Sequence, residues 1–238
     1  RSIDIFLILF FLDSRAVGIY GVAYAAVRLI GMFATAFNFL GTSVASGVEK
    51  EHGVESLLQL YRSVLRWLVI PSVSVLALFT LFPQEFISLV YRPGYAEGGL
   101  ALSVLAVGFV IKNILGTHNP ILQAIGSSKS LAFNNVVAAL VNLGLNLLLI
   151  PRFGIEGAAI ATTISFLVRD LLAVIEVRYY IGSTTLSWKG LGPIVVAIPI
   201  FGGAVFLVHE IPGTLPWIGG FMVEFVSCYV LAVIATLG

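Results

Sequence analysis

Three basic residues stand within long apolar stretches of the sequence: Arg28, Lys112 and Arg169. A charge at the centre of a bilayer costs about 2.5–3.5 kcal/mol on insertion scales, so such charges usually face a bundle interior or a watery cavity. Arg28 and Lys112 have no acid within helical reach in the sequence, whereas Arg169 is followed directly by Asp170. Arg28 and Lys112 are therefore candidates for binding an anion, or else have a structural partner elsewhere. Arg169 is a candidate too, with a buried structural pair to Asp170 as its alternative.

Amide side chains are the second kind of polar group in these stretches. Lys112, Asn113 and Asn119 lie in one apolar run, and Lys112 and Asn119 share a helical face at a spacing of 7 residues. Pro120 removes a backbone donor and would bend such a helix. A bent helix with a polar stripe is a common lining for a transport path. The alternative is that residues 117–120 already lie in the headgroup layer.

A stripe of asparagines follows in the next apolar run. Asn135, Asn142 and Asn146 stand at spacings of 7 and 4 residues and so lie on one face of a helix. Buried asparagines cross-link helices or contact a ligand, and cross-linking is the more common role. Asn142 is nevertheless retained as a candidate ligand-facing residue.

The composition identifies the class of protein that holds these residues. Of 238 residues, 59% are hydrophobic and only 11% are charged, against about a quarter in soluble domains. The mean hydropathy is +1.05. These values exclude disordered, fibrous and nucleic-acid-binding proteins. A single cysteine, Cys228, excludes a disulfide scaffold and any metal site built from several cysteines. The sequence therefore predicts a polytopic membrane protein.

Apolar runs separated by short polar breaks predict an all-α bundle of transmembrane helices. A spanning helix needs about 20 apolar residues, so the run at 3–12 is too short, and we interpret it as the second half of a truncated helix. Proline and glycine at 92–94 and 151–154 indicate turns, and the second turn makes the helices around it antiparallel neighbours. The full helices are predicted at 17–46, 61–82, 99–122, 129–150, 155–178, 190–209 and 215–236.

The distribution of Lys and Arg predicts the orientation, because positively charged loops stay in the cytoplasm. One side of the predicted bundle has seven basic residues in its loops and the other has three. The richer side holds the amino end and the 47–62 loop, which we place in the cytoplasm, with residues 54–66 lying along the interface. The two sets are Arg1, Lys50, Arg62, Arg66, Lys129, Arg178 and Lys189 against Arg15, Arg92 and Arg152.

No motif in the sequence predicts an enzyme. It lacks a Gly-x-Ser-x-Gly elbow, a His-Glu-x-x-His pair and a Walker loop. We therefore expect no catalytic residue, no cofactor and no metal ligand set, and no nucleic-acid partner.

Three segments resemble polysaccharide transporters. They are residues 13–20 (DSRAVGIY), 86–96 (FISLVYRPGYA) and 142–162 (NLGLNLLLIPRFGIEGAAIAT), of which the last is the most specific. The resemblance covers about residues 1–180. It is to the lipid-linked oligosaccharide flippases of the multidrug/oligosaccharidyl-lipid/polysaccharide exporter superfamily, whose helices form two lobes. Residues 1–238 as a whole resemble the second lobe, about helices seven to fourteen, with the last two helices matching only in number. The N-terminal lobe is absent from this sequence.

The resemblance implies a function and some site residues. The implied substrate is a glycan on a polyprenyl phosphate or pyrophosphate, moved across the cytoplasmic membrane by rocking of the two lobes. Arg28 falls on a basic position that faces the central cavity in relatives. Asp4 resembles an acid in the family's seventh helix, although Ile5 stands where the family usually has a basic residue. Lys112 and Arg169 match no motif of the family. They are candidates only because a charge within the bilayer is costly.

Two other functions stay open at this stage. A multidrug efflux transporter of the same superfamily should have an acidic, apolar cavity, whereas basic residues are at least as prominent here. A membrane-embedded glycan polymerase should have a long outer loop rich in acids or arginines. The longest outer link, 83–98, is short and contains only Glu85, Arg92 and Glu97 as charged residues.

Overall fold

The computed structural model describes residues 2–183, and this part of the chain consists of helices joined by short links, without strands. This confirms the all-α bundle expected from the sequence. The predicted helices at 190–209 and 215–236 lie outside the described residues. The elements in chain order are α1 (Ser2–Phe11), α2 (Ser14–Leu81), α3 (Pro83–Val90), the short 3-10 helix η1 (Pro93–Gly98), α4 (Gly99–Leu115), α5 (His118–Ala124) and α6 (Ser128–Ile181).

Local sequence signals account for where several helices begin and end. Asp13 separates α1 from α2, and its Oδ1 accepts the Ala16 N–H at 2.7 Å as an N-cap. Gly154 has φ 60° and ψ −137°, and it marks a sharp kink inside α6 next to Pro151. Gly182 caps the end of α6 with φ 77°. Only glycine adopts these positive φ values without strain, so the predicted turn at 151–154 has a backbone cause.

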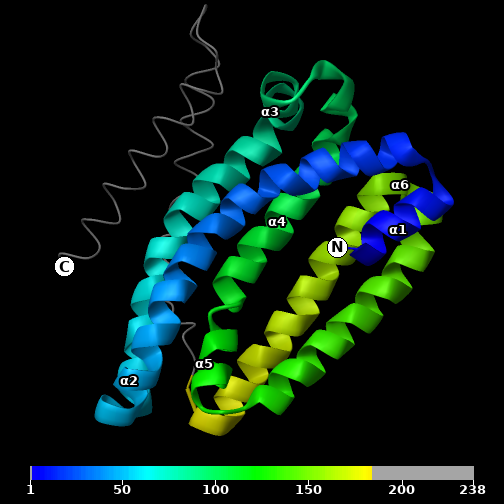
Figure 1. The fold of residues 1–238 in the computed structure, drawn as a ribbon. Coiled ribbons are helices and arrows are strands. Elements are labelled where there is room, and N and C mark those ends of the chain that lie inside the picture. The colour runs from blue at the N-terminus through cyan, green and yellow to red at the C-terminus, as the bar shows by residue number, and fades with distance from the viewer. Residues whose placement is uncertain (1, 184–238) are drawn as a thin grey trace, which may run out of the picture.

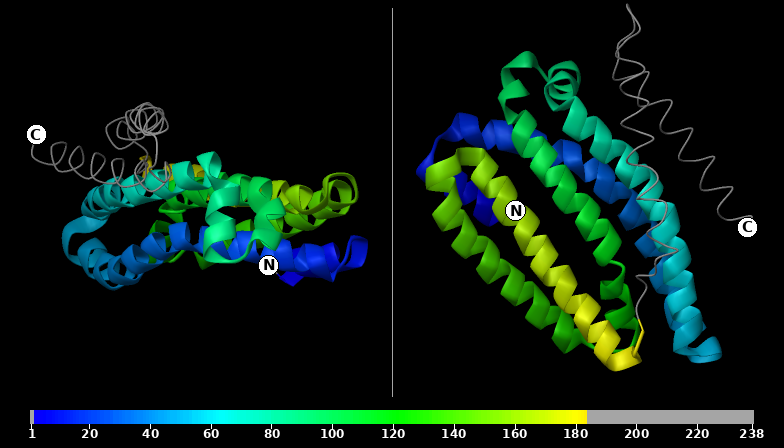
Figure 2. Two further views of the ribbon diagram at one scale, coloured as in Figure 1. Left: turned by 90° about the horizontal axis from the view of Figure 1, so that it is seen from above. Right: turned by 180° about the vertical axis from the view of Figure 1, so that it is seen from behind.

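Two elements, α2 and α6, double back on themselves (Figure 1), so each forms a helical hairpin. In α6 the kink at Gly154 separates arm 128–153 from arm 155–181, and the two arms lie side by side in both figures (Figure 2). Asn134 of the first arm donates to Glu176 Oε2 of the second at 2.7 Å. The hairpin therefore presents side chains of both arms to the rest of the bundle.

Helix α4 lies at the centre of the described bundle and packs between α2 and α6. Asn113 Nδ2 donates to Ile30 O and to Ser72 Oγ, both at 3.0 Å, which ties α4 to both arms of α2. On the opposite side, Gly108 allows α6 to approach closely, and Thr163 Oγ1 of α6 donates to Val104 O at 3.0 Å. Small residues and interhelical hydrogen bonds of this kind hold helices together within a bilayer.

Several described stretches are long and apolar enough to cross a membrane. They are Ser14–Met32, Pro93–Ala124 and Ser128–Ile181, and the pair Pro71–Leu81 and Pro83–Val90 would add a fourth span bent by 94°. The bend turns α3 sharply away from the end of α2, at the top of Figure 1. The link 83–98 is helical along most of its length.

The stretch 99–122, expected as one helix, is broken into α4 and α5 around Gly116 and Thr117. In a continuous helix the Pro120 ring would clash with the carbonyl of Gly116, four residues earlier. The break instead places Pro120 in the first turn of α5, where a missing N–H costs little. The Gly116 carbonyl accepts the Asn119 N–H at 3.1 Å and Asn119 Nδ2 at 3.2 Å.

Candidate functional site

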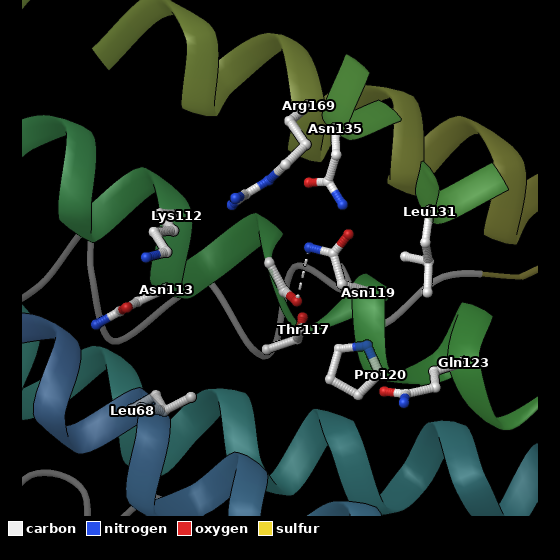
Figure 3. A pocket seen from close by; sticks show the side chains of 11 residues that line it. Leu68, Lys112, Asn113, Thr117, Asn119, Pro120, Gln123, Leu131, Asn135 and Arg169 are labelled. Carbon is white, nitrogen blue, oxygen red and sulfur yellow. Dashed lines mark hydrogen bonds between the residues drawn. The ribbon is translucent and has the colours of Figure 1, made fainter. Parts of the chain in front are cut away.

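Two adjoining cavities lie against α6, the larger beside α2, α4 and α5 and the smaller beside α1 and α2. The larger, of about 380 Å³, is lined by Lys112, Asn119, Asn135 and Arg169 among others (Figure 3). The smaller, of about 220 Å³, also includes Asn135 and Arg169 in its lining and extends to Asp4 and Asn142. Since two residues line both cavities, the polar surface is continuous from the α4–α5 break to α1. Pocket linings of this kind combine apolar walls with a few convergent polar groups.

The larger cavity holds two cations that share an aromatic ring. Lys112 Nζ lies 5.1 Å from the ring centroids of both Phe109 and Phe166, and Arg169 Cζ lies 5.4 Å from that of Phe166. Figure 3 shows Lys112 of α4 and Arg169 of α6 pointing toward the same space, with Asn135 beside Arg169. Cation–π contacts contribute about 0.5–2 kcal/mol each, so they can partly offset the cost of placing these charges within the bundle.

Arg169 has a carboxylate partner next to it in the chain. Its Nε donates to Asp170 Oδ1 at 2.8 Å and its Nη2 to Asp170 Oδ2 at 3.0 Å. Asp170 is fully buried, and its Oδ1 also accepts Asn119 Nδ2 at 3.0 Å. The buried Arg169–Asp170 pair considered from the sequence is therefore confirmed. Arg169 nonetheless lines both cavities.

Lys112 has no carboxylate within salt-bridge distance among residues 2–183, where the ion pairs are between other residues. Arg169 and Arg28 both repel its ammonium group, and Asp170 attracts it. Arg28 itself is exposed on α2 and lines neither of the two cavities. The three basic candidates are thus within electrostatic range of one another around α4, although only Lys112 and Arg169 share a cavity. An excess of positive charge at this point would attract an anion.

Asp4 lies at the other end of the polar surface in a network of hydrogen bonds. Its side chain is 2% exposed, Oδ1 accepts Asn146 Nδ2 at 2.7 Å and Oδ2 accepts Thr162 Oγ1 at 3.3 Å. Asn146 Nδ2 also donates to Asn142 Oδ1 at 3.1 Å, and the Tyr20 hydroxyl lies 3.3 Å from Thr162 Oγ1. The network joins α1, α2 and both arms of α6. Its hydrogen bonds offset part of the cost of burying the Asp4 carboxylate.

The side-chain oxygens of this network are also of the types that coordinate a hard cation. Carboxylate, amide and hydroxyl oxygens are the ligand types of alkali and alkaline-earth ions. Asn146 Oδ1 is buried and accepts no hydrogen bond from the described residues. Within 2–183 no three His, Cys, Asp or Glu side chains gather as a transition-metal site. Asp4, Asn142, Asn146 and Thr162 are therefore the described residues that could hold such an ion.

Asn113 and Asn142 are placed differently by the fold. Asn113 is 3% exposed and uses both donors of its amide to cross-link α4 to α2, at the edge of the larger cavity. Asn142 lines the smaller cavity, where its Oδ1 accepts from Asn146.

Thr162 and Phe166 were not among the candidates drawn from the sequence. They precede Arg169 by 7 and 3 residues on the same helix face, so helical spacing from Arg169 was a signal that could have identified them.

Comparisons with known proteins find relatives along most of the chain, although no family model matches it. It is 26% identical over 206 residues to the probable low-salt glycan biosynthesis flippase Agl15 of Haloferax volcanii, which covers 85% of this chain and 43% of Agl15. It is 31% identical over 178 residues to the probable flippase AglR of the same organism, which covers 72% of this chain and 37% of AglR. The chain thus spans less than half the length of these curated relatives.

A solved structure has a similar fold. The lipid II flippase MurJ, in an inward closed conformation, matches with a TM-score of 0.78 and 15% sequence identity, over 98% of this chain and 49% of the MurJ chain. The likeness is one of fold, and it agrees with the transmembrane helix bundle expected from the sequence. Here too the chain matches about half of the longer protein.

Proposed function

We propose, from the chain's membership of the flippase family of membrane proteins, that it forms one lobe of a transporter for a lipid-linked oligosaccharide. The chain is a multi-pass protein of the cell membrane, with apolar spanning helices and relatives that are membrane proteins. The transporter would serve surface-glycan or polysaccharide biosynthesis, and it would move its substrate without chemical change. A second, N-terminal lobe of the same protein would complete the path.

The observation that carries this proposal is the pair of cations in the larger cavity. The carrier of a lipid-linked glycan is a polyprenyl phosphate or pyrophosphate, whose anionic head and polar sugars cannot enter hydrocarbon unaided. Lys112 and Arg169 face one cavity, with Asp170 as the carboxylate bonded to Arg169. A phosphate entering this space would replace its water shell with charged donors. The isoprenoid tail could remain in the bilayer while the lobes rock about the cavity.

Each candidate residue has a role in this proposal. Lys112 and Arg169 would pair with the phosphate, whereas Arg28, which lines neither cavity, would act on the site through its charge near Lys112. Asn142, in the smaller cavity, would contact sugar hydroxyls, whereas Asn113 would hold α4 in position at the cavity edge. Asp4, also in the smaller cavity, would keep the two arms of α6 together with α1.

The test replaces the basic residues in the complete protein and measures glycan export in the source cell. Lys112→Gln should abolish or strongly reduce surface glycan, and lipid-linked oligosaccharide should accumulate on the cytoplasmic leaflet. Arg28→Ala should reduce export less, because Arg28 contributes only its charge near Lys112. Arg152→Gln is the matched control, because Arg152 is an exposed cation at the α6 turn that lies outside both cavities and, unlike Arg28, is not among the charges acting on Lys112. Protein levels of all variants should equal those of the wild type. Full export by Lys112→Gln would refute the proposed anion site.

Deletion of the whole gene separates this function from the other two classes. A flippase predicts trapped lipid-linked oligosaccharide in the cytoplasmic leaflet. Normal lipid intermediates with raised drug sensitivity would indicate an efflux transporter instead. Shortened glycans on an externally exposed lipid would indicate a polymerase.

A further inference from the structure

One buried carboxylate connects the cationic cavity to the break between α4 and α5. Asp170 is fully buried on α6, and both of its oxygens accept hydrogen bonds from the Arg169 guanidinium, at 2.8 and 3.0 Å. Its Oδ1 also accepts Asn119 Nδ2 of α5 at 3.0 Å. The same carboxylate therefore holds a cation of the cavity and the helix that follows the break.

Asn119 in turn is part of the break itself. Its backbone N–H and its Nδ2 both donate to the Gly116 carbonyl, at 3.1 and 3.2 Å. A methyl group at Gly116 would collide with the Lys112 carbonyl, so the chain folds tightly there. Breaks in membrane helices persist where side chains satisfy the freed backbone groups. Asn119 does this at Gly116 while it binds Asp170, so the shape of the break depends on what Asp170 binds.

The electrostatics set up a competition for Arg169. A buried carboxylate needs a cation or several donors, and Arg169 is the cation paired with Asp170 in the described part of the chain. A phosphate in the larger cavity would attract the same guanidinium, whose five N–H donors suit phosphate as well as carboxylate. Lys112, which has no carboxylate partner within residues 2–183, would add to that attraction. A phosphate therefore competes with Asp170 for Arg169, and the affinity that it gains is reduced by the cost of breaking the pair.

We propose that Asp170 is an internal counter-ion that occupies Arg169 while the cavity is empty, and that an anionic headgroup displaces it and so strengthens its hydrogen bond to Asn119, which draws α5 more firmly against α6. This inference rests on the proposed function, since it needs a phosphate in the cavity. Asp170 acts here as a positioning residue, through Arg169 and Asn119. It converts occupancy of the anion site into a change at the α4–α5 break, which a transporter needs in order to couple binding to movement.

The first measurement is the affinity of the complete protein, in detergent micelles, for farnesyl pyrophosphate as the probe. Asp170→Asn keeps an oxygen that can accept from Asn119 but removes the competing charge. The dissociation constant should therefore fall by about tenfold or more, given the strength of charge interactions at this range. Glu176→Gln is the matched control: it removes the charge of another half-buried carboxylate on α6 that accepts from an asparagine, outside both cavities. Its dissociation constant should stay within about twofold of that of the wild type.

The second measurement follows backbone hydrogen exchange over residues 116–124 with and without the probe. In the wild type, exchange should become slower on binding, because Asp170 without Arg169 holds Asn119 as its remaining described donor and binds it more strongly. In Asn119→Ala, exchange should be fast already and should not respond, while the Arg169–Asp170 pair keeps the affinity near that of the wild type. If Asp170→Asn does not fold, this measurement on the wild type still tests whether anion binding changes the α4–α5 break.

The outcomes separate this inference from the proposed function. A wild-type protein that does not bind the probe, or binds it equally well after Lys112→Gln, overturns both. A wild type that binds through Lys112, with an Asp170→Asn variant of equal or weaker affinity, overturns only the counter-ion role. Unchanged exchange at 116–124 on binding overturns the coupling to the helix break.

Discussion

Gly108→Ala should destabilise the bundle because α4 and α6 meet at this glycine. An added Cβ would lie 2.5 Å from Thr163 Oγ1 and 3.1 Å from Thr163 Cα and Cβ. Ordinary contacts between such atoms are about 3.5–4.0 Å, so the two helices would have to separate by roughly 1 Å. Backbone atoms make up part of this contact, so a change of rotamer cannot relieve it.

The size of the effect follows from three contributions. Overpacking of a well-packed interior costs about 1–3 kcal/mol. The separation also strains the 3.0 Å hydrogen bond from Thr163 Oγ1 to Val104 O, a bond of a kind that contributes about 0.5–1.5 kcal/mol. Alanine regains about 1 kcal/mol in helix propensity over glycine. The net loss in free energy of unfolding should be about 2 kcal/mol.

Denaturant unfolding of the purified protein in mixed micelles measures this loss, and Gly144→Ala is the matched control. Gly144 is also within a helix, but no atom lies within 4 Å of an added Cβ, so this variant should be as stable as the wild type or slightly more so. In a Thr163→Ala background, which removes the nearest atom, Gly108→Ala should cost less.

Function should respond together with stability. Gly108 lies one helical turn before Lys112, so a shift of α4 away from α6 moves the Lys112 ammonium away from the Phe166 ring that it contacts at 5.1 Å. Export should fall in Gly108→Ala and not in Gly144→Ala. Equal stability of the two alanine variants would refute the close approach of α4 and α6 as described.

Other contacts give three further predictions. Asp4→Ala should lower the free energy of unfolding by about 2 kcal/mol, because one amide N–H of the buried Asn146 loses its acceptor, whereas Asp4→Asn keeps an acceptor and should cost less; equal denaturation midpoints would contradict this. Asn113→Ala should cost about 2 kcal/mol by the same measurement, since α4 loses two 3.0 Å hydrogen bonds to α2, and an unchanged midpoint would count against that cross-link. Arg15→Ala should have no measurable effect, because its 2.7 Å pair with Glu97 is exposed on both sides; a clearly lower midpoint would be evidence against this.

The class of the protein and the types of its polar groups could be read from local features of the sequence. Apolar runs imply spanning helices because a bilayer leaves no other partner for the backbone of an isolated segment. The turn at 151–154 was predictable because Gly154 and Pro151 act through their own backbones. The pair of Arg169 and Asp170 was open to prediction because the residues are adjacent.

The relation of the candidates to one another was decided only by the tertiary structure. Asp4 meets Asn146 and Thr162 across 142 and 158 residues of chain, a distance over which helical periodicity carries no information. Arg28 and Asn113 looked alike in sequence as polar residues in apolar runs, yet one is exposed and the other cross-links three helical segments. A sequence shows which side chains are too costly to leave in lipid. Which of them meet in a cavity depends on how the helices rotate and pack.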